Sequence, residues 1–226
     1  MKEIFIIPTT HTQTVNYRSE DIAQVIIQIN PDVIFCELPM NWNETKSDDV
    51  QQDDQEGYAL KIVQEKKNID IVNVDLPYRN EIAQSLNLYS LESKIESILF
   101  PDNPDCLSKT HKKLIQINEN IFLPENKIEY TYLISARFKK LVRKKNRIIK
   151  RIIEKYQRKN RNDITIEHKL SDYFHNDIRE NIIIYNCLQS MRVYNRGVLL
   201  IGAEHINIIN KLNKSGRGFI KGKVFI

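Results

Sequence analysis

Three absences narrow the class of protein to which this chain of 226 residues belongs. No run reaches eighteen apolar residues, so no membrane span is expected. The first residues lead straight into a strand-like run without a signal-peptide pattern. There are only three cysteines, Cys36, Cys106 and Cys187, and no CxxC spacing, which argues against a disulfide framework and a cysteine zinc site. We therefore expect a cytoplasmic protein.

The sequence signatures of several enzyme classes are also missing. The chain has no P-loop, no GxGxxG fingerprint, no GxSxG elbow and no HExxH helix. A Cys–His nucleophile is disfavoured, because Cys36 precedes Glu37 on an expected strand and should point to the opposite face. The chemistry must therefore be sought among histidines and carboxylates.

What the chain does contain is a pattern of strand, turn and histidine that occurs twice. Residues 197–201 form an apolar run, three turn residues follow, and His205 stands where a helix should begin. Residues 3–7 form a similar run, and after the turn residues 8–10 comes His11. Buried strands of a parallel sheet have this continuous apolar character. Both histidines are therefore expected at the carboxyl ends of strands.

Two further strands carry charged residues at the same end. Residues 33–36 are an apolar run ending at Glu37, and residues 69–74 form another that ends at Asp75, with Arg79 shortly after. Strand, crossover helix and strand in this order make the strands parallel. We expect an α/β fold with a mainly parallel sheet between two helical layers, a closing strand at residues 219–226, and these residues lining one concave pocket.

The middle of the chain predicts a mostly helical, basic insertion at about residues 81–165 within one domain spanning residues 1–226. Its last helix, residues 137–161, holds thirteen Lys and Arg and only one acid, Glu154. The segment thus carries +12, whereas the whole chain carries +5. Its polar face could be merely solvated, or it could bind an acidic partner or nucleic acid. The candidate contacts are Arg143, Lys144, Arg147, Lys150 and Arg151.

His11, Glu37 and His205 form the candidate centre. Two imidazoles and a carboxylate can hold a catalytic divalent metal, with Mn, Co or Zn as suitable ions, and they also suit metal-free acid–base catalysis. Each residue could instead be a turn, cap or solvated residue. The other histidines stand in polar helical or loop contexts and are expected outside the site: His111, His168 and His175.

Two four-residue motifs resemble the paired GxxH motifs of the TraB/TIKI superfamily, which includes erythromycin-esterase-like and ChaN-like proteins. They are residues 8–11, where Pro8 replaces the family's glycine, and residues 202–205. Residues 31–38 resemble the family's segment with the pattern "kPDvv..EL", and residues 179–181 resemble its arginine at a helix start. The resemblance covers residues 3–42, 69–79 and 177–226.

The resemblance implies an α/β/α core with two related halves, each a strand, a GxxH motif, a helix and a strand. It also implies a hydrolase site, which is metal-dependent in the Wnt-cleaving members. Other members act without an established metal, bind haem or sequester a peptide pheromone. A shared fold does not fix the reaction.

The leading hypothesis is a metal-dependent hydrolase of a peptide or other amide, with His11, His205 and Glu37 at the metal. Catalytic roles are assigned to Glu37, Arg179 and Glu204, and substrate contacts to Thr10, Asp75, Arg79 and Arg179. Arg179 would hold a substrate carboxylate or the developing oxyanion. Two alternatives stay open: a peptide- or ligand-binding protein without turnover, and an accessory protein that binds nucleic acid or an acidic partner through residues 137–161.

Overall fold

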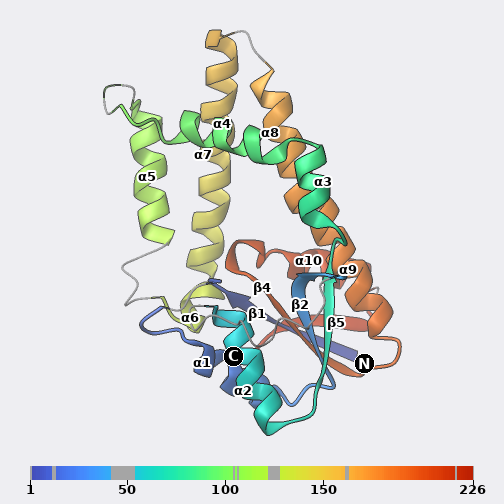
Figure 1. The fold of residues 1–226 in the computed structure, drawn as a ribbon. Coiled ribbons are helices and arrows are strands. Elements are labelled where there is room, and N and C mark those ends of the chain that lie inside the picture. The colour runs from blue at the N-terminus through green and yellow to red at the C-terminus, as the bar shows by residue number, and fades with distance from the viewer. Residues whose placement is uncertain are drawn as a thin grey trace.

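A computed structural model describes most of the chain and shows a parallel sheet between helices (Figure 1). The described residues are 2–11, 14–41, 54–103, 105, 107–121, 128–160, 163–216 and 218–225. They form a five-stranded sheet in the order β3-β2-β4-β1-β5, and every neighbouring pair is parallel. The strands are β1 (Lys2–Thr9), β2 (Val33–Pro39), β3 (Asp70–Asp75), β4 (Arg196–Gly202) and β5 (Ile220–Val224). The expected parallel α/β fold is confirmed.

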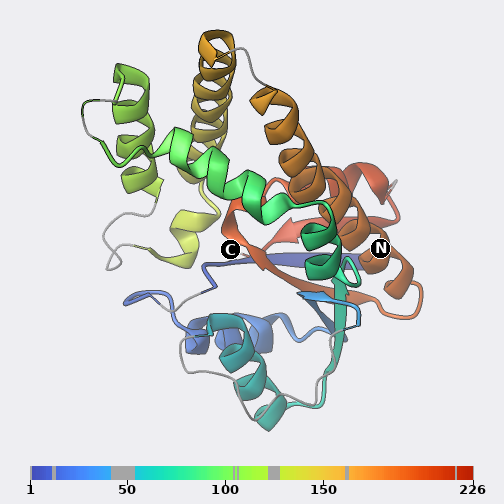
Figure 2. The ribbon, with the colours of Figure 1, turned by 45° about the horizontal axis from the view of Figure 1, so that its top comes forward.

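The three inner strands β1, β2 and β4 are built from apolar residues because both faces of the sheet are covered by helices. Their buried residues include Ile4, Ile6, Val33, Phe35 and Leu199. Helices α1 (Ser19–Ile29) and α2 (Gln55–Lys66) lie on one side of the sheet, and α9 (Arg179–Ser190) and α10 (Ile208–Ser215) lie on the other (Figures 1 and 2). The expected three-layer arrangement is therefore present.

The predicted turn at residues 8–10 begins later than expected. β1 continues through Thr9, and Pro8 pairs with Ile201 of β4 inside the sheet. The neighbour on the other side, β5, pairs with β1 only as far as Ile6, so the N–H group that proline lacks is not needed there. The turn comes at Thr10 and His11, and His11 has a left-handed backbone with φ 61°.

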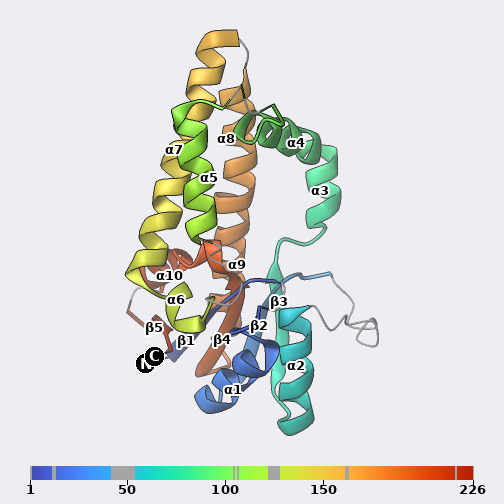
Figure 3. The same cartoon turned by 90° about the vertical axis from the view of Figure 1, so that its left-hand side faces the viewer.

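A helical arm, residues 79–172, joins β3 to the final part of the chain and rises away from the sheet (Figures 1 and 3). The predicted helical character of this insertion is confirmed, except that Arg161 and several loop residues lie outside the described residues. No helix in the described part of the chain is long and apolar enough to cross a membrane. The arm consists of α3 (Arg79–Ser85), α4 (Leu88–Leu99), α5 (Lys109–Ile121), α6 (Tyr130–Leu133), α7 (Ala136–Asn160) and α8 (Ile164–Asp172).

The last arm helix leads into α9 without a break, which corrects the expected helix start near Arg179. A π-helical segment, η4 (Tyr173–Ile178), connects α8 to α9. The residue before Arg179, Ile178, has helical backbone angles, so Arg179 follows a helix and does not open one. A π-helical turn adds a residue to the helical repeat and therefore rotates the side chains that follow. The sequence pattern gave no sign of this turn.

Candidate functional site

A cavity of about 490 Å³ lies at the carboxyl ends of the strands. Histidines from two strand ends line it: His11 follows β1, and His205 ends the short 3₁₀ helix η5 (Ala203–His205) after β4. Glu37 of β2 and Arg179 of α9 also line it. Further lining residues are Cys36, Leu38, Asp54, Glu56, Gly57, Leu60, Arg79, Asn80, Ala83, Tyr89, Phe174 and His175. The structure therefore brings together side chains that are far apart in sequence.

A buried ion network around Arg179 forms one wall of this cavity. Its Nη2 donates to Glu37 Oε1 and to Asp75 Oδ2, both at 2.7 Å, and its Nε donates to Asp75 Oδ1 at 3.2 Å. Arg79 Nη1 adds a second cation at 2.6 Å from Asp75 Oδ2, and Asp75 is fully buried. Burial alone would lower the pKa of Arg179, but the charges of Asp75 and Glu37 raise it. The network fixes two strand ends to α9.

Glu37 is held from two sides. One carboxylate oxygen accepts from Arg179, and the other, Oε2, accepts from the backbone N–H of Gly202 at 2.9 Å. Gly202 ends β4, next to the turn that carries His205. A carboxylate with both oxygens bonded has a fixed orientation. Glu37 therefore ties β2 to β4 at the floor of the cavity.

Each of the two predicted histidines has a carboxylate partner that was not predicted. His11 Nδ1 lies 3.0 Å from Glu56 Oε1, and this hydrogen bond raises the pKa of His11 although 63% of the side chain is exposed. His205 Nδ1 lies 2.9 Å from Glu180 Oε1. Burial by itself lowers the pKa of His205, but Glu180 and the charge of Glu37 outweigh it, so the pKa is raised. In both imidazoles Nε2 is the atom left for chemistry.

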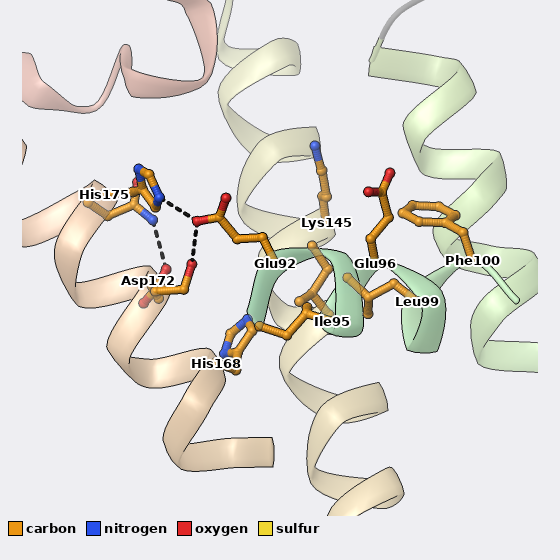
Figure 4. A pocket seen from close by; sticks show the side chains of 12 residues that line it. Glu92, Ile95, Glu96, Leu99, Phe100, Lys145, His168, Asp172 and His175 are labelled. Atoms are coloured by element: carbon orange, nitrogen blue, oxygen red, sulfur yellow. Dashed lines mark hydrogen bonds and ion pairs between the residues drawn. The ribbon is translucent and has the colours of Figure 1, made fainter. Parts of the chain in front are cut away.

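His175 forms a third such pair, which the sequence did not predict. Its Nε2 lies 2.6 Å from Glu92 Oε1 of α4, and its Nδ1 lies 3.4 Å from Arg179 Nη1. Because Arg179 can only donate, Nδ1 accepts and Nε2–H donates to Glu92. Figure 4 shows His175 and Glu92 meeting beside a second cavity of about 360 Å³ in the arm, so His175 lines both cavities.

The other two histidines do not line the main cavity. His168 lines only the second one, where Figure 4 shows it below Glu92. His111 bonds to Ser108 and to the carbonyl of Ile98 within the arm.

Three proposed site residues do not line the cavity. Asp75 is fully buried and bonds to Arg79 and Arg179, so it cannot contact a substrate as predicted. Glu204 Oε1 lies 2.6 Å from Lys145 Nζ of α7 and is absent from the cavity lining. Thr10 donates from its backbone N–H and its hydroxyl to Gln55 Oε1, at 2.8 and 3.0 Å. Glu204 and Thr10 were placed in the site because they neighbour His205 and His11 in sequence. Glu204 instead attaches the turn before His205 to α7, and Thr10 attaches the turn before His11 to α2.

The donor types suit a divalent metal, but their arrangement does not make a three-ligand site. Among the residues that the structure describes, no three His, Cys, Asp or Glu side chains come together as a metal-binding group. Both oxygens of Glu37 are already taken, one of them by the Arg179 cation. A metal held by His11, Glu37 and His205 therefore does not fit the arrangement as it stands.

Comparisons with family models, with curated proteins and with solved structures find no match to this chain.

Proposed function

We propose that the chain is a hydrolase of a peptide or other amide, acting in the cavity between β1, β2 and β4. The observation that carries the proposal is the pair of carboxylate-held imidazoles, His11 with Glu56 and His205 with Glu180, in one cavity. A carboxylate on Nδ1 fixes the tautomer and orientation of a histidine, as in hydrolytic triads. The resemblance to the TraB/TIKI superfamily suggests the same reaction class.

The chemistry needs one imidazole as a base and one as an acid. Nε2 of His205, whose side chain is only 20% exposed, takes a proton from water, and the resulting hydroxide attacks the amide carbon. His11, with its raised pKa, carries the proton that goes to the leaving nitrogen as the C–N bond breaks. The products are a carboxylic acid and an amine.

Arg79 is a better substrate contact than Arg179. Arg179 is bonded to two carboxylates, whereas Arg79 pairs with Asp75 alone, lines the cavity and keeps 26% of its side chain exposed. A guanidinium at this place can bind a substrate carboxylate or the developing oxyanion. We therefore propose a substrate with a free carboxylate near the bond that breaks. Arg179 then acts by holding Glu37 in place, and Glu204 has no role in the reaction.

Metal dependence stays a prediction, as does the cytoplasmic location. His11 and His205 would bind the ion through Nε2. Glu37 would have to release Arg179 before it could bind the ion.

A binding protein without turnover is the second candidate. The observation that favours it is that Glu37 and Arg179 are already bonded to protein groups, so the pocket is preformed and neither side chain is available to activate water.

A mixed library of short peptides tests the proposal. Wild-type protein treated with chelator, and then supplied with Mn²⁺, Co²⁺ or Zn²⁺ in turn, is compared with His205→Gln and His11→Gln. We expect each substitution to reduce cleavage by about 100-fold or more, because acid–base groups contribute about 10²–10⁴-fold. His111→Gln, in the arm, is the matched control and should cleave like wild type. Saturable peptide binding without any product would favour the binding protein.

A further inference from the structure

The exposed face of α7 carries a row of positively charged side chains. Arg143, Arg147, Arg151, Lys155 and Lys159 follow one another at four-residue spacing, and all five are exposed. At 1.5 Å per residue, neighbours in the row are about 6 Å apart and the row spans about 24 Å. We call these five residues the α7 row. The opposite face of the helix is buried through Phe138, Val142, Ile148, Ile152 and Ile153.

The α7 row has no role in folding that accounts for it. Like charges four residues apart destabilise a helix, and the row contains four such pairs. Within the described part of the chain no acid pairs with the row, whereas Lys145, on a different side of α7, is paired with Glu204. The only acid on α7 is Glu154, which is half-buried. Arg143 also donates to Asn207 Oδ1 at 3.3 Å, but that amide carries no charge. A row that costs stability and has no acidic partner among the described residues fits an external polyanion.

We propose that the α7 row binds the phosphate backbone of a double-stranded nucleic acid. Three of its five members are arginines, whose planar guanidinium can bond two phosphate oxygens at once. A duplex offers closely and regularly spaced negative charge, which matches a straight row of cations better than the irregular charges of a folded acidic protein do. The neighbouring helix α5 adds the exposed cations Lys109, Lys112 and Lys113.

The row lacks the features of single-strand or base-specific binding. Proteins that bind single strands stack bases on exposed aromatic rings, and the row contains no aromatic residue. Tyr156, the aromatic residue that follows Lys155, is half-buried against the core. The row therefore contacts backbone and not bases, so its affinity is independent of sequence and depends steeply on salt.

Fluorescence anisotropy with a labelled DNA duplex, and with an RNA duplex of the same sequence, tests the proposal on the full chain. If the five cations contact phosphates, the DNA affinity should fall about 500-fold between about 50 and 200 mM salt. The triple variant Arg147→Gln/Arg151→Gln/Lys155→Gln should bind weakly, with a logarithmic salt slope smaller by about 2.7. Glutamine preserves helix propensity, and circular dichroism checks the fold.

The matched control is Lys61→Gln/Lys66→Gln/Lys214→Gln, which removes the same charge from the exposed faces of α2 and α10. This control should bind like wild type. Equal losses in the two triple variants would overturn the proposal, because net charge alone would then explain binding. Salt-insensitive or undetectable binding by wild type would overturn it as well. So would preferential binding of polyglutamate, which would identify an acidic polypeptide as the partner.

Discussion

Arg179 neutralises two carboxylates that come from different strands, so its removal leaves buried charge without a counter-ion. We expect Arg179→Met to destabilise the protein by about 3–5 kcal/mol, the usual cost of breaking a buried ion pair from one side. For a chain of this size that corresponds to a fall of about 6–20 °C in melting temperature. Thermal unfolding followed by circular dichroism measures it.

Two variants make this test specific to the network. Arg79→Met removes a cation from the same carboxylate, Asp75, but Arg79 is partly exposed, so we expect a cost of about 1 kcal/mol or less. Adding Asp75→Asn to Arg179→Met should recover part of the lost stability, because the buried charge disappears with its partner. Equal losses of stability in Arg179→Met and Arg79→Met would show that Arg179 is not the centre of the network.

The pKa of His205 is raised in the folded protein, which gives its contribution to stability a defined pH dependence. Protonated His205 stabilises the fold below its unfolded pKa, about 6.5, and this stabilisation is lost as pH rises through the folded pKa. We therefore expect the melting-temperature gap between wild type and His205→Gln to be larger at pH 5.5 than at pH 8.5.

His168 provides a control of opposite sign. Burial lowers its pKa, so its neutral form is favoured in the fold, and the stabilisation is lost as pH falls below the ordinary value of about 6.5. The difference in melting temperature between wild type and His168→Gln should therefore be larger at pH 8.5 than at pH 5.5. The same trend for both substitutions would contradict the assignment of the His205–Glu180 pair.

The residues at the strand ends could be predicted from the sequence, but their carboxylate partners could not. His11, Glu37 and His205 could be placed at one rim because parallel strands end on the same side of a sheet. Glu56 lies in the first turn of α2, where an acid is as readily a helix-dipole partner as a histidine partner, and Glu180 lies inside the continuous helical stretch that runs from α8 into α9. Only the tertiary packing distinguishes the two roles.

Among the elements, strand β4 carries two glycines that serve different purposes. A Cβ on Gly202 would lie 2.7 Å from His11 Nε2, and a Cβ on Gly197 would lie 2.7 Å from the Phe35 ring in the core. The backbone angles of Gly202 suit alanine, and His11 is exposed enough to swing away. Gly202→Ala should therefore leave stability nearly unchanged and lower the His11 pKa toward its ordinary value, measured by NMR titration.

Gly197→Ala is the matched substitution in the same strand. Overpacking of a well-filled core costs about 1–3 kcal/mol, so this variant should melt about 2–12 °C lower while the His11 pKa stays raised. A stable Gly197→Ala, or a Gly202→Ala in which the His11 pKa does not move, would show that the two glycines do not have these separate roles.

His175 was expected outside the site because it stands in a polar context in the sequence. The structure places it in the π-helical turn η4, which changes the phase between α8 and α9. His175 therefore faces Glu92 and Arg179 together. Periodicity arguments assume a constant repeat of 3.6 residues and fail at such a turn.

At the scale of the whole molecule, the helical arm covers the cavity and shares the main hydrophobic core with the sheet, through buried residues of α4, α5 and α7. A separate small cluster of Ala83, Leu88 and Phe174 packs α3, α4 and η4 together above the strand ends. Phe174 and Ala83 also line the cavity. The strand ends thus supply His11, Glu37 and His205, the arm helices α3 and α4 supply part of the roof, and η4 supplies His175. The sequence predicted a helical insertion, but the long-range contacts that place it over the strand ends have no local signal.

The most direct measurement of the central claim, hydrolysis at the two carboxylate-held imidazoles, is oxygen-18 incorporation during the peptide-library assay. Cleavage in ¹⁸O-labelled water should give products that each carry one heavy oxygen in the new carboxylate, seen by mass spectrometry as a mass increase of about 2 Da. The account predicts such products with wild type and about 100-fold fewer with His205→Gln. No labelled product under any metal condition, or equal labelling by wild type and His205→Gln, would contradict it.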